Sequence, residues 1–126
     1  MEFMHSMIRV SDIEKSLNFY QDLLEMKLTR EKQLDDCTLY FLTDKNGMVE
    51  IELTHNNENP INGYEIGSGF GHFAFKVDSM DEFTQKLESL GYNYFREPYK
   101  LSSKGSTIAF IKDPDGYEIE LIEKKG

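Results

Sequence analysis

Two short motifs recur in this sequence, and their side chains could together bind a metal ion. A histidine opens both HSMIRV at 5–10 and HFAFKV at 72–77, an offset of 67 residues. The tetrapeptide EIEL stands at 50–53 and again at 118–121, an offset of 68. Because the two offsets nearly agree, the motifs indicate an internal repeat. Two imidazoles and two carboxylates form a mixed nitrogen and oxygen site that suits a divalent first-row metal.

Successive side chains along a strand point to opposite faces of the sheet, so the spacing of the donors shows which face each one occupies. In the first repeat His5 shares a face with Met7 and Arg9, while the EIEL glutamates oppose Ile51 and Leu53. The second repeat follows the same pattern. A lone histidine or glutamate is usually a solvated strand residue, but two pairs at equivalent positions favour ligands. Each repeat then contributes one His and one Glu, from its first and last strands.

The number of donors bears on the metal. A zinc ion with four protein ligands is closed when tetrahedral, which suits a structural role better than catalysis. An octahedral ion with the same four ligands keeps two open positions. The ligand types alone leave the metal open.

The elements that would position the donors also occur twice. In the first repeat a strand at 4–10 precedes an N-cap at Ser11–Asp12, and in the second a strand at 71–77 precedes a capping box formed by Ser79 and Glu82. The predicted apolar faces of the two helices are Ile13, Leu17, Tyr20 and Leu24, and Met80, Phe83, Leu87 and Leu90. Gly91 is expected to end the second helix.

Three strands are expected after each helix. They are predicted at 27–31, 38–43 and 49–54, and at 92–96, 107–112 and 117–122. The turn sequences DKNG and DPDG separate the last two strands of each repeat. The fold class is therefore α+β, with two βαβββ modules whose curved mixed sheets carry helices on the outer face. We predict one domain over 1–126, with module 1 at 4–56, a linker at 57–69 and module 2 at 70–123.

Composition limits the possible partners. The 126 residues include 14 basic and 23 acidic side chains, a formal net charge of −9, which argues against nucleic acid and anionic membranes as partners. The single cysteine, Cys37, excludes an internal disulfide and fits a reducing compartment. No apolar run approaches the roughly 20 residues of a membrane span, and no signal peptide is evident. We therefore expect a cytoplasmic protein.

Several segments together resemble glyoxalase I (lactoylglutathione lyase), in its short bacterial form, within the vicinal oxygen chelate superfamily. They are MHSMIRVSDIEKSLNFY (4–20), EMKLTR (25–30), IELTHN (51–56), YEIGSGFGH (64–72) and IAFIKDPDGYEIELIE (108–123). The resemblance implies metal ligands at His5, Glu52, His72 and Glu120. It also implies a preference for nickel or cobalt, with zinc possible, and a homodimer whose subunits share each active site.

The resemblance further implies a reaction and a set of substrate contacts. The substrate would be the hemithioacetal of methylglyoxal and a thiol, with Glu120 as the first choice of base and Glu52 able to serve the opposite face. Arg9 and Asn56 occupy positions that contact the glutamyl end of glutathione in the family. Lys100 and Lys104 are both candidates for the glycyl carboxylate. The thiol itself stays open, because the loop 97–106 aligns poorly and Asn57 replaces a common Trp.

Other functions of the same fold are possible. A methylmalonyl-CoA-epimerase-like enzyme generally has Gln where Glu52 stands, and a thiol transferase acting on an antibiotic epoxide needs only three ligands. A metal-free drug-binding resistance protein would suit the negative charge but does not need the His and Glu set. A metal-binding relative without a known substrate is a fourth alternative. Met7, Phe70 and Phe110 are candidates for an apolar pocket.

Overall fold

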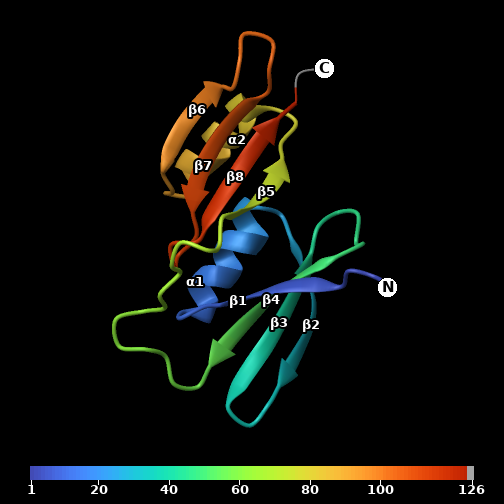
Figure 1. Ribbon diagram of the computed structural model, residues 1–126, viewed down its shortest axis with the longest axis vertical. Helices are drawn as coiled ribbons and strands as arrows, with labels where there is room; N and C mark the ends of the chain where they lie inside the picture. The colour runs from blue at the N-terminus through green and yellow to red at the C-terminus, as the bar shows by residue number, and fades with distance from the viewer. Residues whose placement is uncertain (125–126) are drawn as a thin grey trace. The chain divides into compact units, whose positions relative to one another are not determined.

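The computed structural model describes residues 1–124, and the chain divides into two compact units between Glu65 and Ile66. The first unit contains β1 (His5–Arg9), α1 (Ile13–Asn18), the π-helical turn η1 (Phe19–Leu23), β2 (Lys27–Gln33), β3 (Cys37–Thr43) and β4 (Glu50–Asn56). The second contains β5 (His72–Lys76), α2 (Met80–Ser89), β6 (Arg96–Lys100), β7 (Thr107–Lys112) and β8 (Glu118–Glu123). Figure 1 shows each unit with its own sheet.

The two sheets have the same topology. Their strand orders are β1-β4-β3-β2 and β5-β8-β7-β6. In each sheet the first strand of the module lies at one edge and pairs in parallel with the last strand, and the remaining pairs are antiparallel. The predicted fold class, two βαβββ modules with mixed sheets, is confirmed. This topology places the strand that begins with histidine beside the strand that carries EIEL.

One face of each sheet forms the hydrophobic core with its helix. In the first unit Val10, Leu42 and Leu53 are completely buried, and in the second Ile119 and Leu121 are. Removing such side chains from water is the main favourable contribution to folding. The residues that alternate with them point to the opposite face and are free for other roles. None of the helices in the described part of the chain is long and apolar enough to cross a membrane.

The helix caps agree with the sequence patterns. The side chain of Asp12 accepts a hydrogen bond from the amide of Lys15 at 3.1 Å, and Ser79 accepts one from Glu82 at 3.2 Å. Gly91 follows the end of α2 with φ of +82°, a conformation that glycine adopts without steric cost. The amide of Tyr92 then bonds to the carbonyl of Leu87, as in a Schellman motif.

The buried face of the first helix differs from the predicted one. The fully buried side chains are Ser16, Phe19, Tyr20 and Leu23, whereas Ile13, Leu17 and Leu24 are only partly buried. The buried residues keep ordinary helical spacing and begin at Ser16, before the π-helical turn, so the helix buries a neighbouring face from its first turn onward. In the turn itself the amide of Leu24 bonds to the carbonyl of Phe19, five residues back, which affects only the end of the helix. In α2 the prediction is correct except for Leu90, which is exposed.

One predicted strand is wrong. The strand predicted at 92–96 overlaps the observed one only at Arg96, because β6 lies at Arg96–Lys100. Its pairing with β7 is irregular between Arg96 and Tyr99, where Pro98 has no amide hydrogen to donate. Proline is tolerated here because β6 is an edge strand. The other strands shift by one or two residues, and β7 matches its prediction.

Candidate metal-binding half-sites

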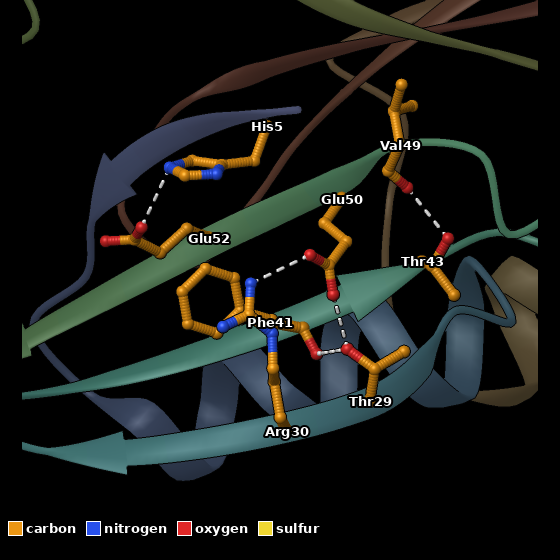
Figure 2. A network of polar contacts seen from close by, with 8 residues as sticks. All are labelled: His5, Thr29, Arg30, Phe41, Thr43, Val49, Glu50 and Glu52. Atoms are coloured by element: carbon orange, nitrogen blue, oxygen red, sulfur yellow. Dashed lines mark hydrogen bonds and ion pairs between the residues drawn. The ribbon is translucent and has the colours of Figure 1, made fainter. Parts of the chain in front are cut away.

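The first unit brings His5 and Glu52 together on the face opposite the helix. Figure 2 shows the two side chains pointing toward each other, and His5 Nε2 lies 3.1 Å from Glu52 Oε1. In the parallel pairing, however, the residue directly opposite Glu52 is Met7. The side chain of Glu52 is 11% exposed and that of His5 is 34% exposed. Phe41, the antiparallel partner of Glu52 on β3, meets the imidazole edge-on with ring centroids 5.6 Å apart.

The second unit repeats this arrangement. His72 Nε2 lies 3.3 Å from Glu120 Oε1, and Ala74 is the residue directly opposite Glu120. Phe110, the β7 partner of Glu120, meets the His72 ring edge-on at 5.5 Å. The same three residue types therefore hold the same relation in both units. Phe110 was expected to line an apolar pocket, and the structure places it against the histidine.

The distances fit two ligands of one metal ion. Bonds of about 2.1 Å to adjacent corners of an octahedron place the two donor atoms about 3.0 Å apart. The imidazole nitrogen and the carboxylate oxygen are also the donor types that first-row divalent metals accept. Among residues 1–124 no group of three or more His, Cys, Asp or Glu side chains is arranged to hold a metal, so each unit offers a pair. The four-ligand site therefore stays a prediction.

The first EIEL motif has two glutamates, Glu50 and Glu52, and their neighbours show which of them can bind a metal. Glu50 accepts hydrogen bonds from Thr29 at 2.6 Å and from Arg30 at 3.1 Å, so both of its oxygens are engaged. These contacts, first that with Thr29 and then that with Arg30, hold the pKa of Glu50 below its ordinary value. Glu52 is left as the carboxylate directed at His5.

Glu52 and Glu120 differ in what contacts the carboxylate oxygen that does not face the histidine. Thr54 donates a hydrogen bond to Glu52 Oε2 at 2.8 Å, while Oε1 faces His5. Two residues beyond Glu120 the chain has Ile122, which has no hydroxyl to donate. The carboxylate of Glu52 is therefore fixed at both oxygens, whereas the described residues restrain Glu120 through His72 alone.

The predicted substrate contacts lie at several places in the two units. Arg9 is exposed at the end of β1, and Asn56 ends β4, where its amide donates to Tyr64 Oη at 2.9 Å. Lys100 ends β6, and Lys104 lies in the turn that follows, both of them exposed. No finding tests the substrate roles of these four residues. Cys37 is buried, and that burial, together with Asp36, raises the pKa of its thiol, which disfavours the reactive thiolate.

Sequence reasoning missed the residues that support the donors. No motif in the sequence links β2 or β3 with His5. The supporting residues on these strands are Thr29, Arg30 and Phe41. One signal was available for Phe41, because the repeat aligns it with Phe110 at an offset of 69 residues. The roles of Thr29 and Arg30 depend on pairing across strands and carry no such signal.

Comparisons with known proteins define the class. A model of the Glyoxalase/Bleomycin resistance protein/Dioxygenase superfamily matches residues 2–121, and the chain belongs to this family. Within it the chain is 40% identical to the lactoylglutathione lyase of Neisseria meningitidis serogroup A, over 99% of this chain and 92% of that protein. It is 38% identical to the lactoylglutathione lyase of Escherichia coli O157:H7, over 99% and 94%. The predicted resemblance, and with it an enzyme of the glyoxalase I type, is confirmed.

Solved structures agree with this assignment. Glyoxalase I from Zea mays superposes with a TM-score of 0.87 at 33% identity, over 99% of this chain. The chain spans only 45% of that protein's length. The trypanothione-dependent glyoxalase I of Leishmania major gives a TM-score of 0.79 at 31% identity, over 98% of this chain and 86% of the other. Glyoxalase I relatives imply a divalent metal and leave its identity open.

Proposed function

We propose that this protein isomerises the hemithioacetal of methylglyoxal and a small thiol to the S-lactoylthiol, with a divalent metal held by His5, Glu52, His72 and Glu120. The observation that supports the proposal most is the duplicated pair of donors. Each pair lies on the open face of its sheet with its nitrogen and oxygen 3.1 or 3.3 Å apart. Nickel or cobalt is the proposed metal, because both accept six ligands and this donor set supplies four.

The reaction needs a proton to move between two adjacent carbons. The divalent metal, when bound, supplies electrostatic stabilisation of the negative charge that develops on the substrate oxygens. We assign the transfer between the carbons to Glu120, which removes the hydrogen from the hemithioacetal carbon and returns it to the neighbouring former carbonyl carbon, while the hydroxyl proton passes to the former carbonyl oxygen. The supporting observation is that Thr54 fixes the second oxygen of Glu52, whereas Ile122 cannot do so for Glu120. A base must leave its resting position, and Glu120 is the less restrained carboxylate.

We further propose that the protein is a cytoplasmic homodimer in which each metal takes donors from both subunits. Each unit offers two donors, so a four-ligand site requires a pair from each of two units. Arg9 and Asn56 are proposed to contact a carboxylate of the thiol, with Lys100 or Lys104 binding a second one. Glutathione has two such carboxylates and is the first thiol to test.

The test uses metal-free protein reloaded with nickel, cobalt or zinc. Methylglyoxal is supplied with glutathione or with another low-molecular-weight thiol, and formation of the thioester is followed by absorbance. We expect turnover with nickel or cobalt, at one metal per chain by elemental analysis. Protein that binds no metal, or that binds metal and converts no hemithioacetal, would contradict the proposal.

A further inference from the structure

Arg30 lies between a carboxylate and an aromatic ring beside the first half-site. Its guanidinium carbon is 3.7 Å from the centroid of the Phe41 ring, and Nη2 is 3.1 Å from Glu50 Oε1. Figure 2 shows the guanidinium stacked on Phe41, with Glu50 above it and Thr29 beside it. A planar cation held by a carboxylate on an aromatic face has a defined orientation.

Thr29 completes this arrangement. Its hydroxyl lies 2.6 Å from Glu50 Oε2 and 3.1 Å from the backbone carbonyl oxygen of Phe41. Glu50 is therefore held from two sides and in turn fixes Arg30. The strands β2, β3 and β4 each contribute to the contacts, so the edge strand is tied to the strand that carries Glu52.

The imidazole of His5 packs against Phe41 and, within residues 1–124, lacks the hydrogen bond that usually orients a metal-binding histidine. Histidines that bind metal through Nε2 usually donate Nδ1–H to a carboxylate or carbonyl, and this fixes the ring. In the described residues His5 Nδ1 is buried and has no hydrogen-bond partner. The aromatic ring that packs against the imidazole is that of Phe41, with an interplanar angle of 82°. Packing against Phe41 thus takes the place of the usual hydrogen bond.

The second unit lacks this support. Arg96 pairs in register with Phe110, as Arg30 does with Phe41, but its guanidinium lies over Tyr99 at 4.4 Å. Within residues 1–124 Glu118, the counterpart of Glu50, forms no ion pair. The chain therefore provides its own control, an arginine at the matching place whose guanidinium lies over Tyr99 and not over the phenylalanine beside the histidine.

We propose that Arg30 is a positioning residue for the first half-site, acting through Phe41 on His5. Thr29 holds Glu50, Glu50 holds the guanidinium, the guanidinium holds the ring of Phe41, and the ring holds the imidazole toward Glu52. The consequence for metal affinity rests on the proposed function, whereas the effect on the His5 ring does not. Arg30 is half exposed, so replacing it leaves the core intact.

The experiment compares Arg30→Ala with the matched control Arg96→Ala. In metal-free protein the ring carbon–proton signals of the histidines are recorded by NMR, and cobalt or nickel affinity is then measured by competition with a chromogenic chelator. We expect Arg30→Ala to move the His5 signal, to leave that of His72 in place, and to weaken metal binding about 10- to 100-fold, the usual effect of removing an outer-sphere support. Arg96→Ala should leave both signals and the affinity unchanged.

A double-mutant cycle with Phe41→Leu separates positioning from general stability. If Arg30 acts through Phe41, Arg30→Ala should add no further loss of metal affinity to the Phe41→Leu variant. An unmoved His5 signal in Arg30→Ala, equal losses in Arg30→Ala and Arg96→Ala, or additive losses in the cycle would each overturn the proposal. Failure of the unmodified protein to bind metal would overturn the proposed function instead, and the NMR comparison would still decide the positioning role.

Discussion

The two His–Glu pairs have nearly the same geometry but different surroundings. His5 and Glu52 are held by Thr54 on the carboxylate and by an Arg30-supported Phe41 on the imidazole. The pair of His72 and Glu120 keeps the edge-on Phe110 without the hydroxyl and without the stacked arginine. The comparison indicates that duplication preserved the donors while their supports diverged. One half-site became the fixed one, and the other kept freedom to move.

The glutamates themselves give the largest expected difference between the halves. Replacing Glu120 with Gln removes the proposed base, and we expect kcat to fall by about 10²- to 10⁴-fold, the range attributed to general acid–base catalysis. Glu52→Gln should act mainly on metal affinity, and its kcat at saturating metal should fall less. Steady-state kinetics with metal content measured for each variant provides the test. If Glu52→Gln lost more kcat than Glu120→Gln at full metal loading, the assignment of the base would be reversed.

A buried hydroxyl gives the next largest difference. Ser16 is completely buried in α1, and its Oγ has no hydrogen-bond partner among the described residues, whereas the equivalent position of α2 holds the apolar Phe83. An unsatisfied buried polar group costs about 1–3 kcal/mol, and alanine is the better helix former. We expect Ser16→Ala to raise the free energy of unfolding by about 1 kcal/mol or more in urea titrations. Ser89→Ala is the matched control, because Ser89 is exposed and already bonds to a carbonyl of its own helix.

The ends of the two helices differ in the residue that takes the left-handed conformation. Gly91 has φ of +82° after α2, and Glu25 has φ of +58° after η1. Gly91→Ala should lower the free energy of unfolding by about 1 kcal/mol, because a Cβ is strained there even though it meets no neighbouring atom. Glu25→Gly relieves the same strain but makes the unfolded chain more flexible, so a gain of a few tenths of a kcal/mol is expected. Thermal unfolding of both variants checks the opposite signs, and equal signs would contradict this account.

The helix ends also show where sequence reasoning succeeds and where it stops. The repeat, the alternation along the strands and the Asp12 and Ser79 caps predicted the fold and the placement of each donor pair, because these signals are local in sequence. The π-helical turn was not predictable from an apolar pattern. The comparison of the two repeats shows its origin once the structure is known. The helical segment of the first repeat, α1 with η1, has 6 and 5 residues, whereas α2 has 10. One additional residue has been absorbed as a wider turn.

The supports of the first half-site escaped prediction for a different reason. Arg30 contacts Phe41 and Glu50 only because β2 pairs with β3 and β3 with β4, and a bulge lies between Leu28 and Arg30. A shift of one residue in that register would turn Arg30 to the other face of the sheet. The residues are present in the sequence, but the register that brings them together can be read only from the folded sheet.

The smallest expected effect concerns Glu50 and the pH dependence of stability. Thr29 and Arg30 lower the pKa of Glu50 in the folded state, so its contribution to stability is fully present above the ordinary value of 4.5 and is lost as the pH falls through the lowered pKa. Glu50→Gln should therefore reduce the free energy of unfolding at pH 7 by less than about 1 kcal/mol, as is usual for a partly exposed ion pair. The difference between the two proteins should shrink below pH 4.5. Metal-free protein in urea titrations at several pH values is the measurement, and a difference that grew on acidification would show that Glu50 is not stabilised by its neighbours in the folded state.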